Sequence, residues 1–181
     1  MKEIALNILD IAENSVSGGA GRIRVGIQLD QENSLLKVSI EDNGRGMDES
    51  ELALTADPFY TTRITRKVGL GIPLFRQHAE MAGGKLEIQS ISGKGTRVEA
   101  SFKEDHPDRQ PLGDLEGCWL MLINSYPDIE WILELHSKWG GFSISTSEIK
   151  TELEIEVIRG AELTDYLKRL IRNNMDALGF K

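Results

Sequence analysis

Residues 42–47 read Asp-Asn-Gly-Arg-Gly-Met, and this run constrains the chain more than any other because of the stretches on either side of it. Asn14 lies upstream in a segment with helical periodicity, and residues 69–71, Gly-Leu-Gly, lie downstream at the start of a second such segment. Residues 93–96, Gly-Lys-Gly-Thr, follow between two alternating segments. Each stretch is weak evidence alone, but the four in this order outline a complete nucleotide pocket.

The composition is typical of a soluble globular protein, with 40% hydrophobic and 28% charged residues in a chain of 181. This length accommodates one domain, or one domain with a small appendage. No apolar run approaches the roughly 20 residues of a membrane helix, and the acidic, amphipathic amino terminus does not resemble a secretory signal. Cys118 is the single cysteine, which excludes an internal disulfide and suits a reducing compartment. We therefore expect a cytoplasmic protein with no membrane partner.

The charge distribution argues against two classes of function. The net charge is −8, and residues 105–181 carry most of the excess acid. Neither half of the chain offers the basic face that binding to a phosphate backbone requires, so we expect no nucleic-acid partner. Three scattered histidines and one cysteine also make a transition-metal site improbable.

Hydrophobic periodicity predicts an α/β two-layer sandwich, in which helices cover one face of a mixed sheet. Residues 1–104 read as one domain in the order helix, two strands, short helix, loop, helix, two strands. Asp48 is a good N-cap for the short helix. The other expected helices span 3–17 and 69–82, the expected strands span 22–30, 36–40, 85–92 and 96–103, and the loop spans 56–68.

Residues 105–116 contain two prolines and several acids and are expected to be a linker. Residues 117–181 are then expected to form a small acidic α/β module of unknown role. Its amphipathic stretch at 128–135 could pack on its own sheet or on a second copy of the chain, which leaves a homodimer open. The predicted elements are a strand at 117–124, a helix at 128–139, a strand pair at 142–158 and a helix at 161–178.

Asp42 is expected to end a strand directly before Gly44 and Gly46. Glycine is favoured where the backbone turns sharply or lies against a ligand. A carboxylate in that setting can accept a hydrogen bond from the exocyclic amine of adenine, whereas guanine carries a carbonyl at the same position. The competing interpretation is a tight loop whose aspartate fixes its own turn, and this motif alone does not separate the two.

Asp10 and Asn14 are four residues apart and therefore share one face of the first helix, which Asn7 extends. An amide oxygen beside a carboxylate suits Mg²⁺, because this ion takes few protein ligands and completes its octahedron with phosphates and water. The alternative is a solvated helix face, and that interpretation fits Asn7 well.

Gly69, Leu70 and Gly71 open the second long helix, and the unpaired amides of a helix N-terminus favour anions. Arg63 and Lys67 lie in the loop just ahead and could close over phosphates as a lid. The chain contains no Gly-x-x-x-x-Gly-Lys-Ser/Thr run, so this is not a P-loop. Leu70 and Gly71 can equally serve to pack the helix on the sheet.

Together these stretches resemble the ATP-binding domain, with its Bergerat-type fold, that is shared by DNA gyrase, the heat-shock chaperones of ninety kilodaltons, histidine kinases and mismatch-repair ATPases. The resemblance covers residues 3–103. It implies ATP and Mg²⁺ as cofactors, with Asn14 coordinating the metal and Asp42 binding the adenine amine. It also implies that the base is lined by Gly44, Gly46 and Met47 and supported by Thr96, and that the phosphates meet Gly69, Leu70 and Gly71.

Asp10 departs from the pattern of this family. The hydrolysing branches carry a glutamate there that activates water, and an aspartate shortens the reach by about 1.5 Å. A misplacement of about 1 Å can cost roughly 10²-fold in rate, so Asp10 is a general-base candidate with weak expected turnover. Histidine kinases also carry a helical hairpin with the phosphoacceptor histidine before this domain. Few residues precede Asn7 here, so we expect a stand-alone form.

The resemblance implies an ATP–Mg²⁺ binding regulatory protein, either a protein kinase or a slow ATPase that acts on a partner protein. The alternative is a nucleotide-gated binding module that does not turn over ATP usefully. In that case ATP would order the loop at 56–68, and the ordered loop would present a surface to the partner.

Overall fold

A computed structural model describes residues 3–55 and 71–180 of the chain. The strands are β1 (Arg22–Asp30), β2 (Leu35–Asp42), β3 (Lys85–Ile91), β4 (Gly95–Lys103), β5 (Glu130–Ser137) and β6 (Gly140–Ser145). The helices are α1 (Ile4–Ser17), α2 (Glu49–Leu54), α3 (Gly71–Met81), α4 (Leu115–Ser125), α5 (Thr146–Glu152) and α6 (Ala161–Ala177). The elements expected within residues 1–104 are confirmed wherever the structure describes them, and the termini of those helices and strands shift by a few residues at most.

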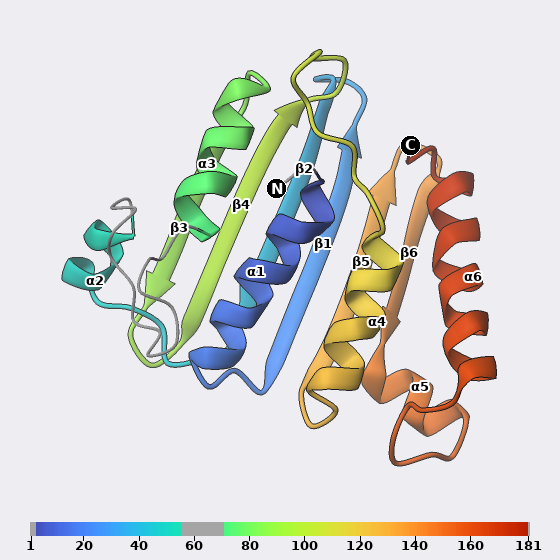
Figure 1. The fold of residues 1–181 in the computed structure, drawn as a ribbon. Coiled ribbons are helices and arrows are strands. Elements are labelled where there is room, and N and C mark those ends of the chain that lie inside the picture. Colours follow the sequence, from blue (N-terminus) through green and yellow to red (C-terminus); the bar gives the residue numbers. More distant parts are fainter. Residues whose placement is uncertain (1–2, 56–70, 181) are drawn as a thin grey trace.

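The strands form one mixed sheet in the order β3-β4-β2-β1-β5-β6. Only the β1–β5 pair is parallel among these described strands, and the other neighbouring pairs are antiparallel. Helices α1, α3, α4 and α6 lie over one face of the sheet (Figure 1). The expected α/β two-layer sandwich with helices on one face is therefore confirmed.

The residues of each strand alternate between the two faces of this sheet. In β1, Ile23, Val25 and Ile27 are buried under the helices, while Arg22 and Arg24 on the opposite face are exposed. That open face carries cross-strand ion pairs, which include Arg22–Glu130 at 2.6 Å, Arg24–Glu134 at 3.5 Å and Arg97–Glu41 at 2.9 Å. Exposed pairs of this kind add at most about 1 kcal/mol each, so the stability of the sheet comes mainly from its apolar, helix-covered face.

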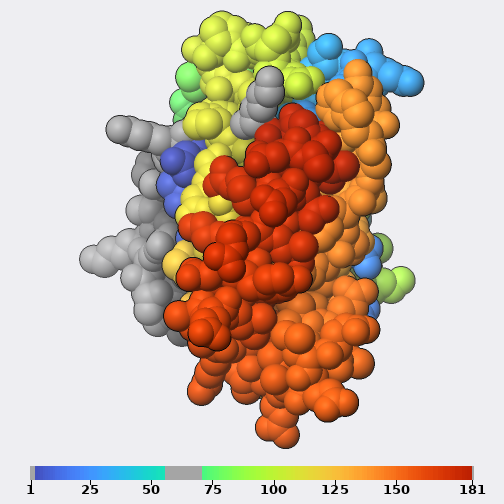
Figure 2. All heavy atoms as spheres, turned by 90° about the vertical axis from the view of Figure 1, so that its right-hand side faces the viewer, coloured from blue at the N-terminus to red at the C-terminus, as the bar shows by residue number. Residues whose placement is uncertain are grey.

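The C-terminal strands continue the sheet of the N-terminal half. β5 lies parallel to β1, with Ile23 opposite Trp131 and Ile27 opposite Leu135, and the buried residues of both halves form one core. Figure 2 shows α6 across this end of the molecule, with the residues of β5, β6 and α5 beside and below it. The division of the chain at residues 104 and 117 stays a prediction, because a shared sheet and core do not tell whether the halves unfold together.

The connection that was expected to be a linker lies against the N-terminus of α1. The carbonyl of Pro111 accepts from the amide of Ile4 at 3.0 Å, and that of Leu112 accepts from Ala5 at 2.9 Å. Leu112 itself is buried. Residues 111 and 112 thus satisfy two of the amides that a helix leaves unpaired at its start.

Two predicted elements of the C-terminal half have the wrong type. Residues 117–124 belong to helix α4, not to a strand, and Asp114 caps this helix by accepting from the amide of Gly117 at 3.0 Å. An unbroken apolar run does not distinguish a buried helix from a buried strand. The helix predicted at 128–139 is strand β5, in which Trp131, Leu133 and Leu135 alternate with more exposed residues. The amphipathic helix that left a homodimer open therefore does not exist.

The strand pair predicted over 142–158 is half correct. β6 is present, but α5 follows it directly, and no strand is assigned to residues 146–158. Ser145 and Glu148 form a capping box at the start of α5, each side chain bonding the backbone amide of the other. This Ser-x-x-Glu spacing is the sequence signal for a helix start that the alternation of the following residues concealed.

We predict that the two halves unfold as one cooperative unit. Leu133→Ala removes a fully buried side chain of β5 and should lower the free energy of unfolding by about 2–5 kcal/mol. Amide hydrogen exchange should then speed up in β4 as well as in β5. The neighbouring Ile132→Ala is the matched control, because Ile132 lies on the partly exposed face and its loss should cost under about 1 kcal/mol. Unchanged protection of β4 in Leu133→Ala would show that the halves unfold separately.

Candidate functional site

The helix-facing side of the sheet turns from apolar to polar at one cross-strand row of residues. Ile40, Val98 and Ile88 lie side by side in β2, β4 and β3. Two positions further along, the same three strands place Asp42 beside Thr96 and Thr96 beside Ser90. We call these last three residues the polar row. It ends the core beneath α1 and offers hydrogen-bonding groups where the preceding row offers hydrocarbon.

The Asp42 carboxylate is held by three donors. Its Oδ1 accepts from the amides of Gly44 at 2.9 Å and Thr96 at 3.3 Å. Its Oδ2 accepts from the Ser15 hydroxyl at 2.6 Å. Asn14 precedes Ser15 in α1, so the predicted metal ligand and the predicted base ligand lie at the same end of the molecule. Ser15 was not singled out from the sequence, although its place next to Asn14 was a usable signal.

Ser90 is the other member of the site that sequence reasoning missed. Its hydroxyl accepts from the amide of Met47 at 2.8 Å and donates to the carbonyl of Gly95 at 3.1 Å. It also lies 2.8 Å from the Thr96 hydroxyl. The hairpin register, which puts Ser90 opposite Thr96, is the signal that could have found it.

Glycines let the backbone segments around the polar row approach closely. A Cβ on Gly44 would lie 2.8 Å from the carbonyl oxygen of Gly18. Gly46 has a φ of 64° and Gly95 a φ of 114°, and a Cβ on either would overlap a neighbouring backbone carbonyl, that of Ile91 or of Asp42. These glycines therefore form a cradle of bare backbone beside the polar row.

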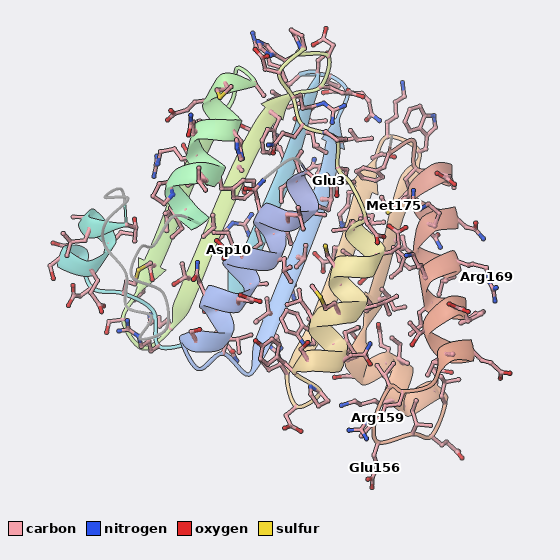
Figure 3. The ribbon with its side chains drawn as sticks, viewed as in Figure 1. Glu3, Asp10, Glu156, Arg159, Arg169 and Met175 are labelled. Carbon is pink, nitrogen blue, oxygen red and sulfur yellow. The ribbon has the colours of Figure 1, made fainter. Side chains whose placement is uncertain are left out.

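Asp10 and Asn14 meet the start of α3. Asp10 projects from α1 toward α3 (Figure 3), and a Cβ on Gly71 would overlap its carboxylate. The same Cβ would lie 3.6 Å from Nδ2 of Asn14. Gly71 thus lets the first turn of α3, where amides lack helical partners, lie directly against a carboxylate and an amide.

Asn7 does not lie on a solvated face, contrary to the interpretation that fitted it from the sequence. It is fully buried, and its Nδ2 donates to the carbonyl of Glu3 and to Gln110, each at 3.2 Å. Its Oδ1 lies 3.3 Å from Nδ1 of His78 in α3. Burial lowers the pKa of His78, so the ring is neutral at pH 7 and its Nδ1–H can donate to Asn7. Asn7 therefore fixes α3 against α1 and is no part of a metal site.

Four of the predicted site residues lie outside the described part of the chain: Arg63, Lys67, Gly69 and Leu70. Among the described ones, Met47 contributes its backbone amide to Ser90. Asp48 follows and caps α2, with the Ser50 hydroxyl and then the Glu51 amide holding its pKa below the usual value. Within residues 3–55 and 71–180, no group of three or more acidic, histidine or cysteine side chains could hold a metal ion.

The groups present fit ATP with Mg²⁺. Mg²⁺ binds in proteins through one or two hard oxygen ligands together with substrate phosphates, and Asn14 and Asp10 supply such oxygens beside a helix N-terminus. The polar row supplies acceptors for an amine, and the glycine cradle lets the surrounding backbone segments pack closely beside that row. Across the described helices, none is both long and apolar enough to cross a lipid bilayer.

Comparison with known proteins gives the same picture. The sequence profile of the family described as "Histidine kinase-, DNA gyrase B-, and HSP90-like ATPase" matches residues 1–106. The non-motile and phage-resistance protein of Caulobacter vibrioides is 31% identical over 120 residues, covering 63% of this chain and 14% of that protein. Sporulation kinase E of Bacillus subtilis is 38% identical over 97 residues, covering 53% of this chain and 13% of that protein.

The matched segment of the chain thus spans about a seventh of the length of each of these two relatives. A crystal structure of the N-terminal domain of a DNA repair protein has the same fold, with a TM-score of 0.56 and 17% identity over 81% of this chain and 53% of that one. The family match spans more than half of the sequence and contains every described residue of the polar row, the glycine cradle and the Asp10–Asn14 pair. The chain belongs to the family of histidine kinase-, DNA gyrase B- and HSP90-like ATPases.

Proposed function

We propose that this protein is an ATP–Mg²⁺ dependent regulatory enzyme, either a protein kinase or a slow ATPase, that acts on a partner protein. The observation that carries the proposal is the Ser15–Asp42 hydrogen bond of 2.6 Å. It joins the helix that bears Asn14 to the strand end that bears Asp42. The two parts of one nucleotide, its base and its phosphates, can therefore be bound across this junction.

Each group has a role in this proposal. When bound, ATP supplies the phosphoryl group and Mg²⁺ neutralises charge on the phosphates. Asn14 holds the metal, and the first turn of α3 presents amides to the phosphates. Asp42 accepts from the amine of the base. Catalysis of phosphoryl transfer depends mostly on positioning and charge stabilisation, and these residues supply positioning.

Asp10 limits turnover in this proposal. Its carboxylate already occupies the space beside Gly71 that a Cβ would take. A glutamate would place its carboxylate one methylene further, into the first turn of α3. The site is therefore built around the shorter acid, and the shorter acid suits transfer to a partner better than rapid activation of water.

Two observations support a partner protein. The named relatives include Sporulation kinase E, and a kinase needs an acceptor. The residues beyond 106 lie outside the family match and add α4, β5, β6, α5 and α6 to the domain. These elements supply surface that the ATP-binding fold does not itself require.

A second candidate is a binding module that is controlled by nucleotide binding and does not turn over ATP usefully. The close fit of Asp10 against Gly71 favours it, because a base that is short and confined accelerates hydrolysis poorly. The Asn14 amide at the same helix N-terminus disfavours it, since a pure switch needs binding alone. The two candidates differ in whether any product forms.

Asp42→Asn should weaken ATP binding by about 10- to 150-fold, because a hydrogen bond to a charged acceptor contributes roughly 1.5–3 kcal/mol. The variant should fold, since the Asn amide oxygen can still accept from Gly44 and Thr96, and its amide nitrogen can donate to the Ser15 hydroxyl. Titration calorimetry with ATP and Mg²⁺ measures the change. Glu41→Gln is the matched control, as the exposed neighbour on the open face. Unchanged binding in Asp42→Asn would refute the assignment of the base.

Asn14→Ala should abolish product formation in a single-turnover assay with labelled ATP, and chelation of Mg²⁺ should do the same to the unchanged protein. Asp10→Asn separates the two chemistries. A general base contributes about 10²- to 10⁴-fold to the rate. A fall of that size in the rate of product formation by Asp10→Asn indicates hydrolysis, whereas a rate within about tenfold of the wild type indicates transfer. Absence of product in every variant, with ATP still bound, would support the nucleotide-gated module instead.

A further inference from the structure

We propose that Ser90 is a specificity-determining residue that acts through Thr96: it holds the Thr96 hydroxyl as a hydrogen-bond acceptor, so that the polar row selects a nucleobase with an exocyclic amine over one with a carbonyl. The inference rests on the proposed function, because it takes the polar row as the place where the base binds. It goes beyond that function by assigning a role to a residue that need not touch the nucleotide.

The Ser90 hydroxyl carries a single proton and lies within hydrogen-bond distance of three groups. A serine hydroxyl donates one hydrogen bond and has two lone pairs to accept others. Ser90 accepts from the Met47 amide at 2.8 Å and donates to the Gly95 carbonyl at 3.1 Å. One lone pair is left, and the Thr96 hydroxyl lies 2.8 Å away.

We infer that Thr96 donates to Ser90, because this direction lets all three contacts of the Ser90 hydroxyl be made at once. With this arrangement Ser90 makes all three of its hydrogen bonds, and the Gly95 carbonyl keeps its donor. The reverse arrangement would take the proton from Gly95 and leave one Ser90 lone pair unused. Because the proton of Thr96 is committed to Ser90, its oxygen offers only lone pairs to a ligand.

Asp42 offers only lone pairs as well, since an ionised carboxylate has no proton to donate. Asp42 and Thr96 are direct cross-strand partners, and the Thr96 amide is already used on Asp42 Oδ1. Two adjacent acceptors thus face the same space. The two hydrogens of a 6-amine can supply both acceptors. A 6-carbonyl brings a third acceptor, and the single N1–H beside it can supply only one of the two.

The effect should be selective and not merely structural. Leaving a buried polar group without its partner costs about 1–3 kcal/mol, and sites built to bind a donor reject analogues that lack it. Ser90 also ties Met47 to the β3–β4 hairpin. Loss of that structural tie alone would weaken every nucleotide equally, so the preference between two bases separates the two roles.

The test compares ATP with inosine triphosphate, which carries a carbonyl in place of the 6-amine and an N1–H donor in place of the N1 acceptor. Dissociation constants are measured by calorimetry for the wild type, Ser90→Ala, Ser90→Thr and Ser92→Ala. In Ser90→Ala the Thr96 hydroxyl is free to donate, so the preference for ATP should fall by about tenfold, mostly through tighter binding of inosine triphosphate. Ser90→Thr keeps a hydroxyl and should keep the preference. Ser92 is exposed and outside the polar row, so its replacement should change nothing.

A second comparison shows whether Ser90 acts through Thr96. The double variant Thr96→Val, Ser90→Ala should have the same ratio of the two dissociation constants as the single variant Thr96→Val. An equal loss for both nucleotides in Ser90→Ala, or the same shift in the Thr96→Val background, would overturn the inference. If Ser90→Ala does not fold, Ser90→Cys takes its place with the same two outcomes. A wild type that binds neither nucleotide would refute the proposed function itself, which is a different result.

Discussion

The hydrogen bond from Ser15 to Asp42 is the contact on which the arrangement of the site depends. It spans the two layers of the sandwich, because Ser15 lies in α1 and Asp42 ends β2. The acceptor is ionised and the distance is 2.6 Å, which places the bond among the stronger ones in proteins. Asn14 and Asp10 lie on the same helix, so this one bond also sets where they stand relative to Asp42.

Close backbone packing supports that bond. Gly44, Gly46 and Gly95 each pack so closely against a backbone carbonyl that a side chain at that position would collide with its oxygen. The amide of Arg45 donates to Gly18 at 2.9 Å, which joins the loop after β2 to the end of α1. Helix, loop and hairpin are therefore held together by main-chain contacts, and the polar side chains project from a stiff frame. Preorganised groups of this kind lose little entropy when a ligand arrives.

Part of this site was predictable, because within each short motif the spacing of the residues determines which of them share a face. Asp10 and Asn14 share a helix face by periodicity alone, and the alternation of β2 puts Asp42 on the helix-facing side. What escaped prediction depended on tertiary contacts. Asn7 has the spacing of a metal-site residue, yet burial against His78 and Gln110 gives it a structural role. Nothing in the local pattern distinguishes the two outcomes.

The errors in the C-terminal half have a different cause. Residues 117–124 are apolar on every side because α4 is buried nearly all round, and without a polar face the helical period cannot be seen. β5 shows its period of two in the burial of its residues, although the apolar Ile132 interrupts the alternation in the sequence. Its partner β1 lies about a hundred residues earlier in the chain. Local sequence does not reveal a parallel pairing of that range. The capping signal at Asp114 could have decided residues 117–124, and the capping signal at Ser145 could have decided residues 146–158.

Asn43 shows how the added strands bear on the site. Its side-chain oxygen accepts from the amides of Gly21 at 2.9 Å and Arg22 at 2.8 Å. Gly21 in turn accepts from the amide of Glu130, and the Arg22 guanidinium pairs with the Glu130 carboxylate at 2.6 Å. The loop between Asp42 and Gly44 is thus bonded to the start of β1, and β1 to the start of β5. Coupling between distant parts of a protein requires an element that can adopt two arrangements. A continuous chain of hydrogen bonds of this kind makes the structure stiffer instead. The C-terminal strands therefore stiffen the site, because they hold in place the start of β1 to which the loop after Asp42 is bonded.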